Sequence, residues 1–344
     1  MRQLPHTEYK DYRGVGVRLM EPMLDDLTAD AAVGRDAPMI AGYHAFDKAH
    51  VLMLGEEGLI PNKDAVILLK TLREMESSGV DEQRSKQSWG LHAGESYLIN
   101  KLGYEIGGRI HLARSSGDLM AVSYRIAART KTLNILKGIN NLRLALLPFA
   151  ISTADAVMAG QTHGVHAQPT TLGAQVIAWD ALLERDHSRF YHSYKQTNCS
   201  PAGAAIMTGS PFAVNRHSTA DRLGFDSVIP STFDAIIGAF DYELEAFSAV
   251  AILSENLGTF ARDIAFWYSD EAELIDIPDR FCHTSSIMMH KKNPVALEQI
   301  SGSGSDAIGG LMASFVDKKK RSGGAEGAGH SFFTLLECFD TAIR

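Results

Sequence analysis

Residues 242–267, YELEAFSAVAILSENLGTFARDIAFW, decide the fold class. Apolar residues recur every three or four positions along the whole stretch, which is the periodicity of an α-helix. They leave little polar surface on any side of this helix, and a helix that is apolar on most sides must be covered on most sides. For one chain of 344 residues, this predicts contact with neighbouring subunits. We therefore expect an oligomer whose long helices pack together.

A second long helix is predicted at 119–157, where apolar residues share one face and Pro148 is the only interruption. This helix is several times the usual globular length, so it should belong to a long bundle and bend near the proline. Shorter helices are expected at 47–56 and 64–75, and the glycine-rich segment 323–329 is expected to be a loop. Because strand signals are weak throughout, the sequence predicts an all-α protein.

Composition excludes several classes of protein. The formal net charge is −8, and basic residues are scattered apart from the run 318–321, so the chain lacks the basic face that nucleic acid requires. The three cysteines form no CxxC pair, which argues against a disulfide framework or a structural zinc site. The N-terminus is polar, without the apolar core of a signal peptide, and no run of about 18 apolar residues occurs. We expect a cytoplasmic protein.

Three separated stretches are richer in polar and glycine residues than the helices around them. They are GGRIHLARSSGD at 107–118, GQTHGVHAQPTTLG at 160–173 and TSSIMMHKKNP at 284–294. In the third, Asn293 and Pro294 are typical of a helix start, with Asn as N-cap and Pro at the first helical position.

Serines, lysines and an asparagine thus precede a helix N-terminus, where an anion such as a carboxylate is favoured. A hydroxyl such as Ser285, placed beside Lys291 and this helix dipole, could act as a base. The same pattern also occurs in a solvated loop that merely precedes a helix. From the residues alone, both interpretations stay open.

The second stretch places Thr162 beside His163, with His166 three residues on. A histidine here could orient or transfer a proton while Thr162 donates to a carboxylate. No carboxylate or cysteine accompanies the two histidines at ligand spacing, which argues against a metal site. A histidine satisfied within the core is the alternative that the pattern leaves open.

In the first stretch, Arg114 offers a guanidinium suited to bidentate carboxylate binding, and Ser115 and Ser116 add hydroxyls. Asp118 is expected to cap the helix that follows. An Arg-Ser turn at a helix start is also common without any ligand, so this pattern does not decide between binding and structure.

Taken together, the three stretches resemble the three signature regions of the fumarase/aspartase/argininosuccinate lyase superfamily, in the same order. SSIMMHKKNP is similar to the family loop GSSxMPxKxNP, and GRIHLARSSGD is similar to the GRSRND region of argininosuccinate lyases. THGVHAQPTTLG combines their THxQxAQP with the THGQxAxPTT of adenylosuccinate lyases. AGYHAFDKAHVLMLGEEGLI and the closing FDTAI also fit, so the resemblance covers most of the chain.

By position, the resemblance assigns the main catalytic groups. Ser285 corresponds to the base that removes a proton from carbon. Lys291 and Asn293 correspond to groups that bind the carboxylate next to this carbon. His163 corresponds to the catalytic-site histidine, paired with Glu298. Four further positions are expected to complete the binding of the succinyl group: Arg114, Ser115, Thr162 and Ser286. Ser116 and Gln168 are also expected to bind substrate.

The family resemblance also implies an architecture and an activity. It implies an all-α homotetramer with a twenty-helix core, in which each active site draws on three subunits. The domains are expected at 1–112, an N-terminal helical domain, and 113–344, the central bundle, with the usual C-terminal domain absent. The implied activity is that of an amidine-lyase-like carbon–nitrogen lyase, which releases fumarate and an amine reversibly from an N-succinyl substrate. No metal or organic cofactor is expected.

Departures from the family pattern concern the leaving amine. The family's Arg-Asn is Ser116-Gly117 here, its Gln in THxQ is Val165, and its MPQ is 288–290, Met-Met-His. Gly324 and Gly329 occupy positions where argininosuccinate lyases carry a Tyr and a Gln. The substrate is therefore expected to be argininosuccinate or a related aminopolycarboxylate such as ethylenediamine disuccinate.

Two alternatives remain at the level of sequence. The stretch THGVHAQPTTLG also favours an adenylosuccinate lyase or a carboxymuconate cycloisomerase built on the same fold. The altered catalytic loop favours a catalytically silent structural homologue. Turnover assays with the respective substrates, and with a Ser285 variant, separate these alternatives.

Overall fold

The computed structural model describes residues 37–87, 91–237, 240–317 and 330–344. Within these ranges the chain is helical apart from turns, loops and three short pairs of strands, so the predicted all-α class is confirmed. The predicted loop at 323–329 lies outside the described residues. Among the helices that are described, none is both long and apolar enough to cross a membrane.

The chain forms two compact units. The first contains the described residues of 1–129 and 198–239, and the second contains those of 130–197, 240–320 and 326–344. Helix α7 (Ser116–Ser152) contributes residues to both. The division at residue 112 that the sequence suggests stays a prediction.

The first unit packs its helices around an apolar core that α2, α3 and α5 supply. Leu54 of α2, Leu68 of α3 and Leu98 of α5 are fully buried in one cluster. Besides the start of α7, its described elements are η3 (Ala37–Met39), α2 (Ile40–Glu56), α3 (Asn62–Ser77), α4 (Val80–Ser85), α5 (Ala93–Leu102), α6 (Tyr104–Gly107), η4 (Gly108–His111), β3 (Cys199–Ser200), η5 (Ala205–Met207), α9 (Arg216–Arg222), β4 (Ser227–Val228) and α10 (Thr232–Ile237). Strands β3 and β4 pair in parallel.

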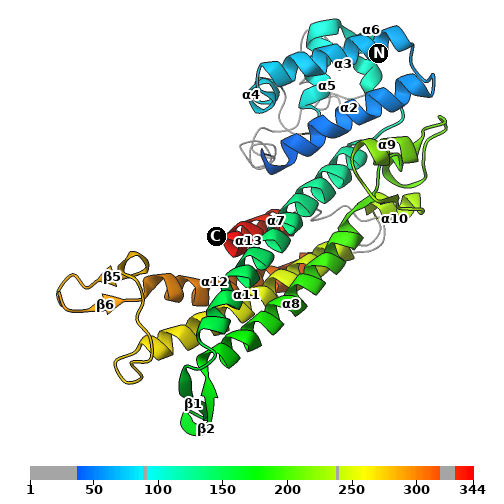
Figure 1. The fold of residues 1–344 in the computed structure, drawn as a ribbon. Helices are drawn as coiled ribbons and strands as arrows, with labels where there is room; N and C mark the ends of the chain where they lie inside the picture. The colour runs from blue at the N-terminus through cyan, green and yellow to red at the C-terminus, as the bar shows by residue number, and fades with distance from the viewer. Residues whose placement is uncertain (1–36, 88–90, 238–239, 318–329) are drawn as a thin grey trace. The chain divides into compact units, whose positions relative to one another are not determined.

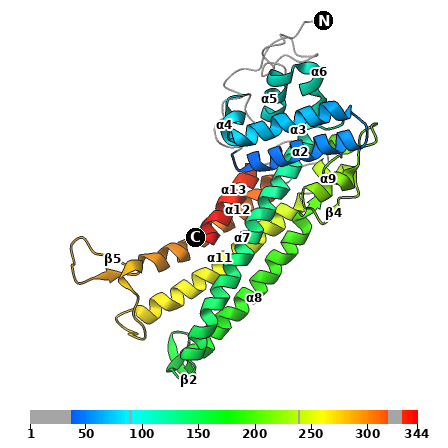
Figure 2. The same cartoon turned by 45° about the horizontal axis from the view of Figure 1, so that its top comes forward.

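The second unit is a bundle of long helices (Figures 1 and 2). Helix α11 packs against α8, α12 and α13, and this central position explains its apolar sequence. Besides the rest of α7, the described elements are β1 (Val157–Thr162), β2 (Val165–Thr171), α8 (Leu172–Thr197), α11 (Asp241–Tyr268), η6 (Asp279–Phe281), β5 (His283–Thr284), β6 (Lys292–Asn293), α12 (Val295–Asp317) and α13 (His330–Ile343).

Specific contacts fix the helices of the second unit. Between α8 and α11, the Trp179 ring lies 5.2 Å from that of Phe260 and 5.3 Å from that of Trp267, measured between centroids. Between α7 and α8, Arg143 donates from Nε and Nη2 to the two carboxylate oxygens of Asp180, at 2.8 and 3.2 Å. Aromatic packing and a bidentate ion pair therefore set the helix positions together.

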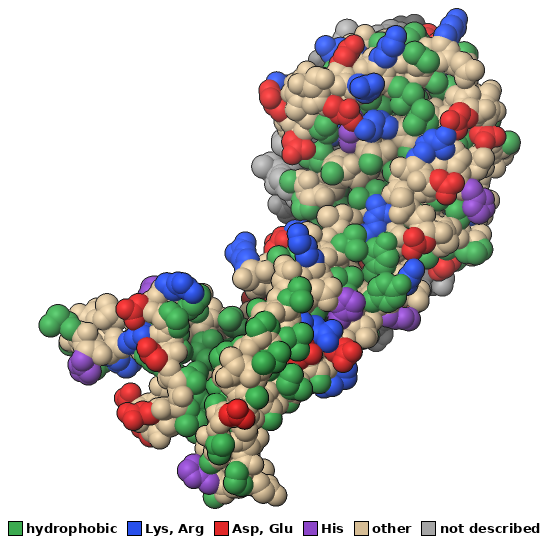
Figure 3. All heavy atoms as spheres, viewed as in Figure 1, with side chains coloured by type: hydrophobic (Ala, Val, Ile, Leu, Met, Phe, Trp, Pro, Cys, Tyr) green, Lys and Arg blue, Asp and Glu red, His purple; other side chains and the backbone are tan. Residues whose placement is uncertain are grey.

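Large apolar side chains remain exposed on the helices of the second unit. On α12, Met312 is 62% exposed and Val316 is 74% exposed. On α7, Leu144 is 67% exposed and Ile151 is 77% exposed. Figure 3 shows hydrophobic side chains running along the long helices. Exposed apolar surface of this extent is typical of a protein–protein interface.

The predicted elements agree with the structure in most places. The long helices expected at 119–157 and 242–267 are α7 and α11, and Pro148 lies inside α7. The expected end of the first helix was wrong, because α7 ends at Ser152 and Val157 begins β1. The expected helix start at Asn293-Pro294 was one residue early, because Asn293 pairs in β6 and the helix begins at Val295. The antiparallel hairpin β1–β2 was not predicted.

Candidate functional site

The first signature stretch forms a tight turn at the start of α7. The buried carboxylate of Asp118 accepts the Ser115 backbone N–H at 2.9 Å through Oδ2. Its Oδ1 accepts the N–H groups of three successive residues, 203–205, at 2.9, 3.0 and 3.3 Å. Burial raises the pKa of Asp118 in spite of these donors. Asp118 therefore does more than cap α7, since it ties the Ser115 turn to the loop at 203–205.

Arg114 is buried, and its guanidinium is already partly engaged. Nη1 donates to Asp47 Oδ1 at 2.7 Å, and the guanidinium lies over the Phe46 ring at 5.8 Å. Arg84 forms a second ion pair with Asp47. Burial alone would raise the pKa of Asp47, but Arg114 and Arg84 hold it below its usual value. Among described residues, Arg114 Nε and Nη2 have no hydrogen-bond partner, although both atoms are buried.

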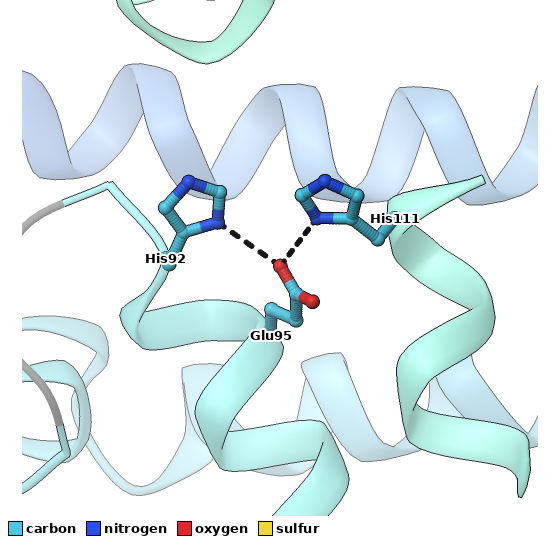
Figure 4. Close-up of side chains that lie close together, drawn as sticks. All are labelled: His92, Glu95 and His111. Atoms are coloured by element: carbon cyan, nitrogen blue, oxygen red, sulfur yellow. Dashed lines mark hydrogen bonds and ion pairs between the residues drawn. The ribbon is translucent and has the colours of Figure 1, made fainter. Parts of the chain in front are cut away.

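Ser116, the first residue of α7, belongs to a hydrogen-bonded network. Its Oγ lies 3.0 Å from His92 Nε2, and His92 Nδ1 lies 3.0 Å from Glu95 Oε2. His111 Nδ1 lies 2.8 Å from the same Glu95 oxygen, and the two histidine rings stack at 5.5 Å (Figure 4). Sequence reasoning did not single out His92, Glu95 and His111. The spacing of His92 and Glu95, three residues apart at the start of a helix, was a usable signal.

The ligand-type atoms of His92, Glu95 and His111 lie within 4.8 Å of one another, and such a set can in principle hold a divalent metal. In this structure, however, each histidine Nδ1 is within hydrogen-bonding distance of one carboxylate oxygen. The positive charge of Arg114 also acts on Glu95. A carboxylate with two imidazole donors and a guanidinium nearby is already satisfied, so hydrogen bonding accounts for the cluster.

The second signature stretch forms the hairpin β1–β2 at the end of α7 (Figure 1). Its two-residue turn consists of His163 and Gly164, at φ 57° and 73°, and two positive φ values are the mark of a type I′ turn. Thr162 and Gln168 on the strands are exposed, as is His163. The hairpin thus presents the predicted residues to solvent.

The third signature stretch forms the loop between β5 and β6. Ser285 Oγ accepts the backbone N–H groups of Ile287 at 3.3 Å and Met288 at 3.1 Å. The Ser285 N–H donates to the Lys291 carbonyl at 3.3 Å, which closes the loop. Two N–H donors on one hydroxyl oxygen favour its negatively charged form.

The two neighbouring lysines of this loop differ in their contacts. Lys292 Nζ pairs with Asp276 at 3.2 Å and with Asp279 at 2.9 Å, and these two carboxylates raise the pKa of Lys292. Tyr268 donates its hydroxyl to the Lys292 carbonyl at 3.1 Å. Lys291 is exposed, and none of the ion pairs found among described residues involves it. Lys292 therefore anchors the loop, whereas Lys291 keeps its charge available.

The predicted site residues fall into three separate groups within this chain. The turn at α7 groups Arg114, Ser115 and Ser116; the hairpin groups Thr162, His163 and Gln168; the loop and the start of α12 group Ser285, Ser286, Lys291, Asn293 and Glu298. Among the described residues, no hydrogen bond or ion pair joins His163 to Glu298, and both are exposed. Figures 1 and 2 show β1–β2 and β5–β6 apart from each other within the second unit.

Comparison with known proteins decides the family. A family model described as lyase matches residues 75–309. The chain is also similar to an argininosuccinate lyase from Methanospirillum hungatei, with 33% identity over 299 residues. The chain belongs to the fumarase/aspartase superfamily of lyases. An argininosuccinate lyase from Methanothrix thermoacetophila is 37% identical over 267 residues.

The match to these members of the superfamily covers 86% and 77% of this chain, but 58% and 54% of the relatives. The chain thus spans little more than half the length of the curated relatives. Among solved structures, an EDDS lyase variant with bound fumarate matches with a TM-score of 0.80 and 26% identity. An EDDS lyase in complex with formate gives the same values, and each match covers 92% of this chain and 63% of the other.

Proposed function

We propose that this protein is a carbon–nitrogen lyase that releases fumarate from an N-succinyl compound by removing a proton from carbon. The observation that carries the proposal is the geometry of the 285–291 loop. There, two backbone N–H groups donate to Ser285 Oγ, and the unpaired cation Lys291 lies in the same loop, in a chain of this superfamily.

Proton removal from carbon requires the hydrogen-bond donors and the positive charge that this loop provides. Removal of a proton from the carbon next to a carboxylate creates a doubly charged intermediate, which needs preorganised donors and positive charge. Lys291, Asn293 and the N-terminus of α12 supply both, since Asn293 directly precedes Pro294 and the first helical residue. Ser285, as an alkoxide, takes the proton. The electron pair then moves to expel the amine, leaving fumarate.

We further propose that the active site forms in a homotetramer, from the three signature stretches of three subunits. In one chain the hairpin and the 285–291 loop lie apart, and most of their residues are exposed. The exposed apolar side chains on α7 and α12, such as Leu144 and Met312, offer the surface that subunits would bury. Burial of large apolar side chains at this interface is worth roughly 1.5–3 kcal/mol each.

The substrate class follows from the relatives and from the departures in sequence. The relatives are named argininosuccinate lyase and EDDS lyase, and a structure of the latter binds fumarate. Fumarate is therefore the product that we propose. Ser116 and Val165 stand where argininosuccinate lyases carry Arg and Gln, which favours a different amine in the second half of the substrate.

Incubation of the protein with fumarate and a panel of amines tests the proposal. We expect N-succinyl adducts to form with at least one amine while the absorbance of fumarate falls, and argininosuccinate and ethylenediamine disuccinate to serve as reference substrates. Ser285→Ala should lower turnover by about 100-fold or more. Ser305→Ala is the matched serine control, since this exposed hydroxyl of α12 donates to the Gly302 carbonyl, and it should keep wild-type turnover.

Two other outcomes would redirect the proposal. Cleavage of adenylosuccinate, with all amino acid adducts inert, would favour the adenylosuccinate lyase type that the 160–173 stretch also resembles. A folded tetramer that acts on no substrate of the panel would favour a catalytically silent homologue.

A further inference from the structure

The network around Glu95 reaches the surface through the Ser116 hydroxyl and through His111, whose side chain is 40% exposed. Ser116 is half-buried, whereas His92 and Glu95 are 5% and 4% exposed. Two contacts of 3.0 Å link these side chains: Ser116 Oγ lies beside His92 Nε2, and His92 Nδ1 lies beside Glu95 Oε2. The same order of hydroxyl, imidazole and carboxylate allows proton transfer in hydrolases.

The protonation states in this network follow from Glu95. Burial alone would raise the pKa of Glu95, but hydrogen bonds from His111 and His92 and the charge of Arg114 hold it well below its usual range. Glu95 is therefore an acceptor only, and each histidine must carry a proton on Nδ1. His92 Nε2 then accepts the Ser116 proton when the ring is neutral. When the ring is charged, Nε2 donates to Ser116.

The groups around His92 leave its Nε2 able to exchange a proton with Ser116. His111 stacks on its ring, and its Nδ1 points at the same carboxylate. The nearby His50 stays neutral, because burial and then Arg114 lower its pKa to about 3. Asp47 is neutralised by its ion pairs with arginines. Glu95 contacts His92 directly, and its negative charge stabilises a charged ring.

We propose that Ser116 donates the proton to the departing amine, and that His92 and Glu95 are positioning residues that hold and recharge this hydroxyl. The inference rests on the proposed lyase function. It is favoured by the place of Ser116, which lies in the same turn as Arg114 and Ser115, the residues proposed to bind the succinyl group.

The proton and electron balance is complete. Ser285 removes the proton from carbon, and the carbon–nitrogen bond breaks with its electron pair moving to nitrogen. Ser116 Oγ gives its proton to this nitrogen and takes the Nε2 proton of charged His92, whose positive charge Glu95 has stabilised. Solvent returns a proton to His92 and accepts the one on Ser285, so the net products are fumarate and the amine.

The decisive experiment separates proton removal from amine departure. The substrate is argininosuccinate or ethylenediamine disuccinate, or another adduct from the amine panel if the wild type cleaves neither. Fumarate release is measured beside deuterium uptake from heavy water into unreacted substrate, by nuclear magnetic resonance. In Ser116→Ala we expect fumarate release to fall by about 100-fold or more, while deuterium uptake continues. Ser116→Thr keeps a hydroxyl and should retain most of the activity.

Two further variants test the positioning residues. Added imidazole should restore part of the activity of His92→Ala, because a free ring can replace the missing one. Glu95→Gln should shift the high-pH limb of the rate profile to lower pH, since the charged ring loses its carboxylate. The exposed Ser77→Ala variant is the control for a serine change in the first unit and should behave as wild type.

The outcomes that overturn the inference are distinct from failure of the proposed function. Equal fumarate release by Ser116→Ala and wild type, or loss of release and of deuterium uptake in parallel, would remove Ser116 from the donor role. The lyase function would stand in both cases. A wild-type protein that neither releases fumarate nor exchanges deuterium with any substrate would overturn both proposals together.

Discussion

Replacement of Asp47 by Asn should destabilise the first unit more than any other single polar change described above. The Asp47 side chain is fully buried, and the side chains of Arg84 and Arg114 are 2% and 1% exposed. The amide keeps the shape of the carboxylate but leaves both guanidinium groups buried without a counter-charge. Removal of one partner of a buried ion pair lowers the stability by about 3–5 kcal/mol. Because Asp47→Asn leaves two buried cations without a partner, we expect a loss near the upper end of this range.

Hydrogen exchange of peptides from α2 and α5, followed by mass spectrometry, measures this loss locally. A loss of about 3–5 kcal/mol corresponds to exchange that is roughly 100-fold to several thousand-fold faster, if the amides exchange through opening of this unit. The control is Glu82→Gln, which breaks the exposed ion pair between Glu82 of α4 and Lys86. It should leave exchange unchanged, because exposed pairs contribute little.

The pH dependence of the Asp47 effect has a defined sign. The pKa of Asp47 is lower in the folded protein than its usual value of about 3.9. Its stabilisation is therefore fully present above about pH 4 and is lost as the pH falls through the folded value. Asp47→Asn should lack this acid-dependent component. If exchange in α2 and α5 is the same in both proteins at neutral pH, the ion pairs do not stabilise the unit and the reasoning is wrong.

Two further changes test packing in the first unit. Leu68→Ala removes a fully buried side chain of α3 and should cost about 2–5 kcal/mol in thermal or urea unfolding, whereas Val66→Ala, at a site 49% exposed, should cost much less. Gly107→Ala places a Cβ 2.6 Å from the backbone of Ile99 and should cost about 1–3 kcal/mol of stability. Gly108→Ala meets no atom within 4 Å and should not destabilise the protein by a clash. Equal effects of the two alanines would refute this account.

The long helices were predictable because their signal is local. In α7 and α11 the apolar residues repeat within each turn, so a window of the sequence contains all the information needed. The start of α12 shows the limit of such a signal. The strand pairing of Asn293 with His283 depends on a contact across a loop, and this pairing moved the helix start by one residue.

The polar contacts were less predictable because they join distant parts of the sequence. Arg114 and Asp47 are 67 residues apart, and Ser116 and His92 are 24 residues apart. The sequence indicates that Arg114 and Ser116 are chemically competent, but not which partners already engage them. The assembly of the predicted residues into one site is a property of several chains, and it stays a prediction.

The turn of the β1–β2 hairpin affects how His163 should be studied. His163 adopts a left-handed backbone conformation that Gly, Asn and Asp tolerate better than most residues. Alanine or valine at this position would disturb the main chain of the hairpin along with the imidazole, and a loss of activity would then have two causes. Asparagine removes the ring while keeping the turn, so it is the substitution that isolates the chemistry of the side chain.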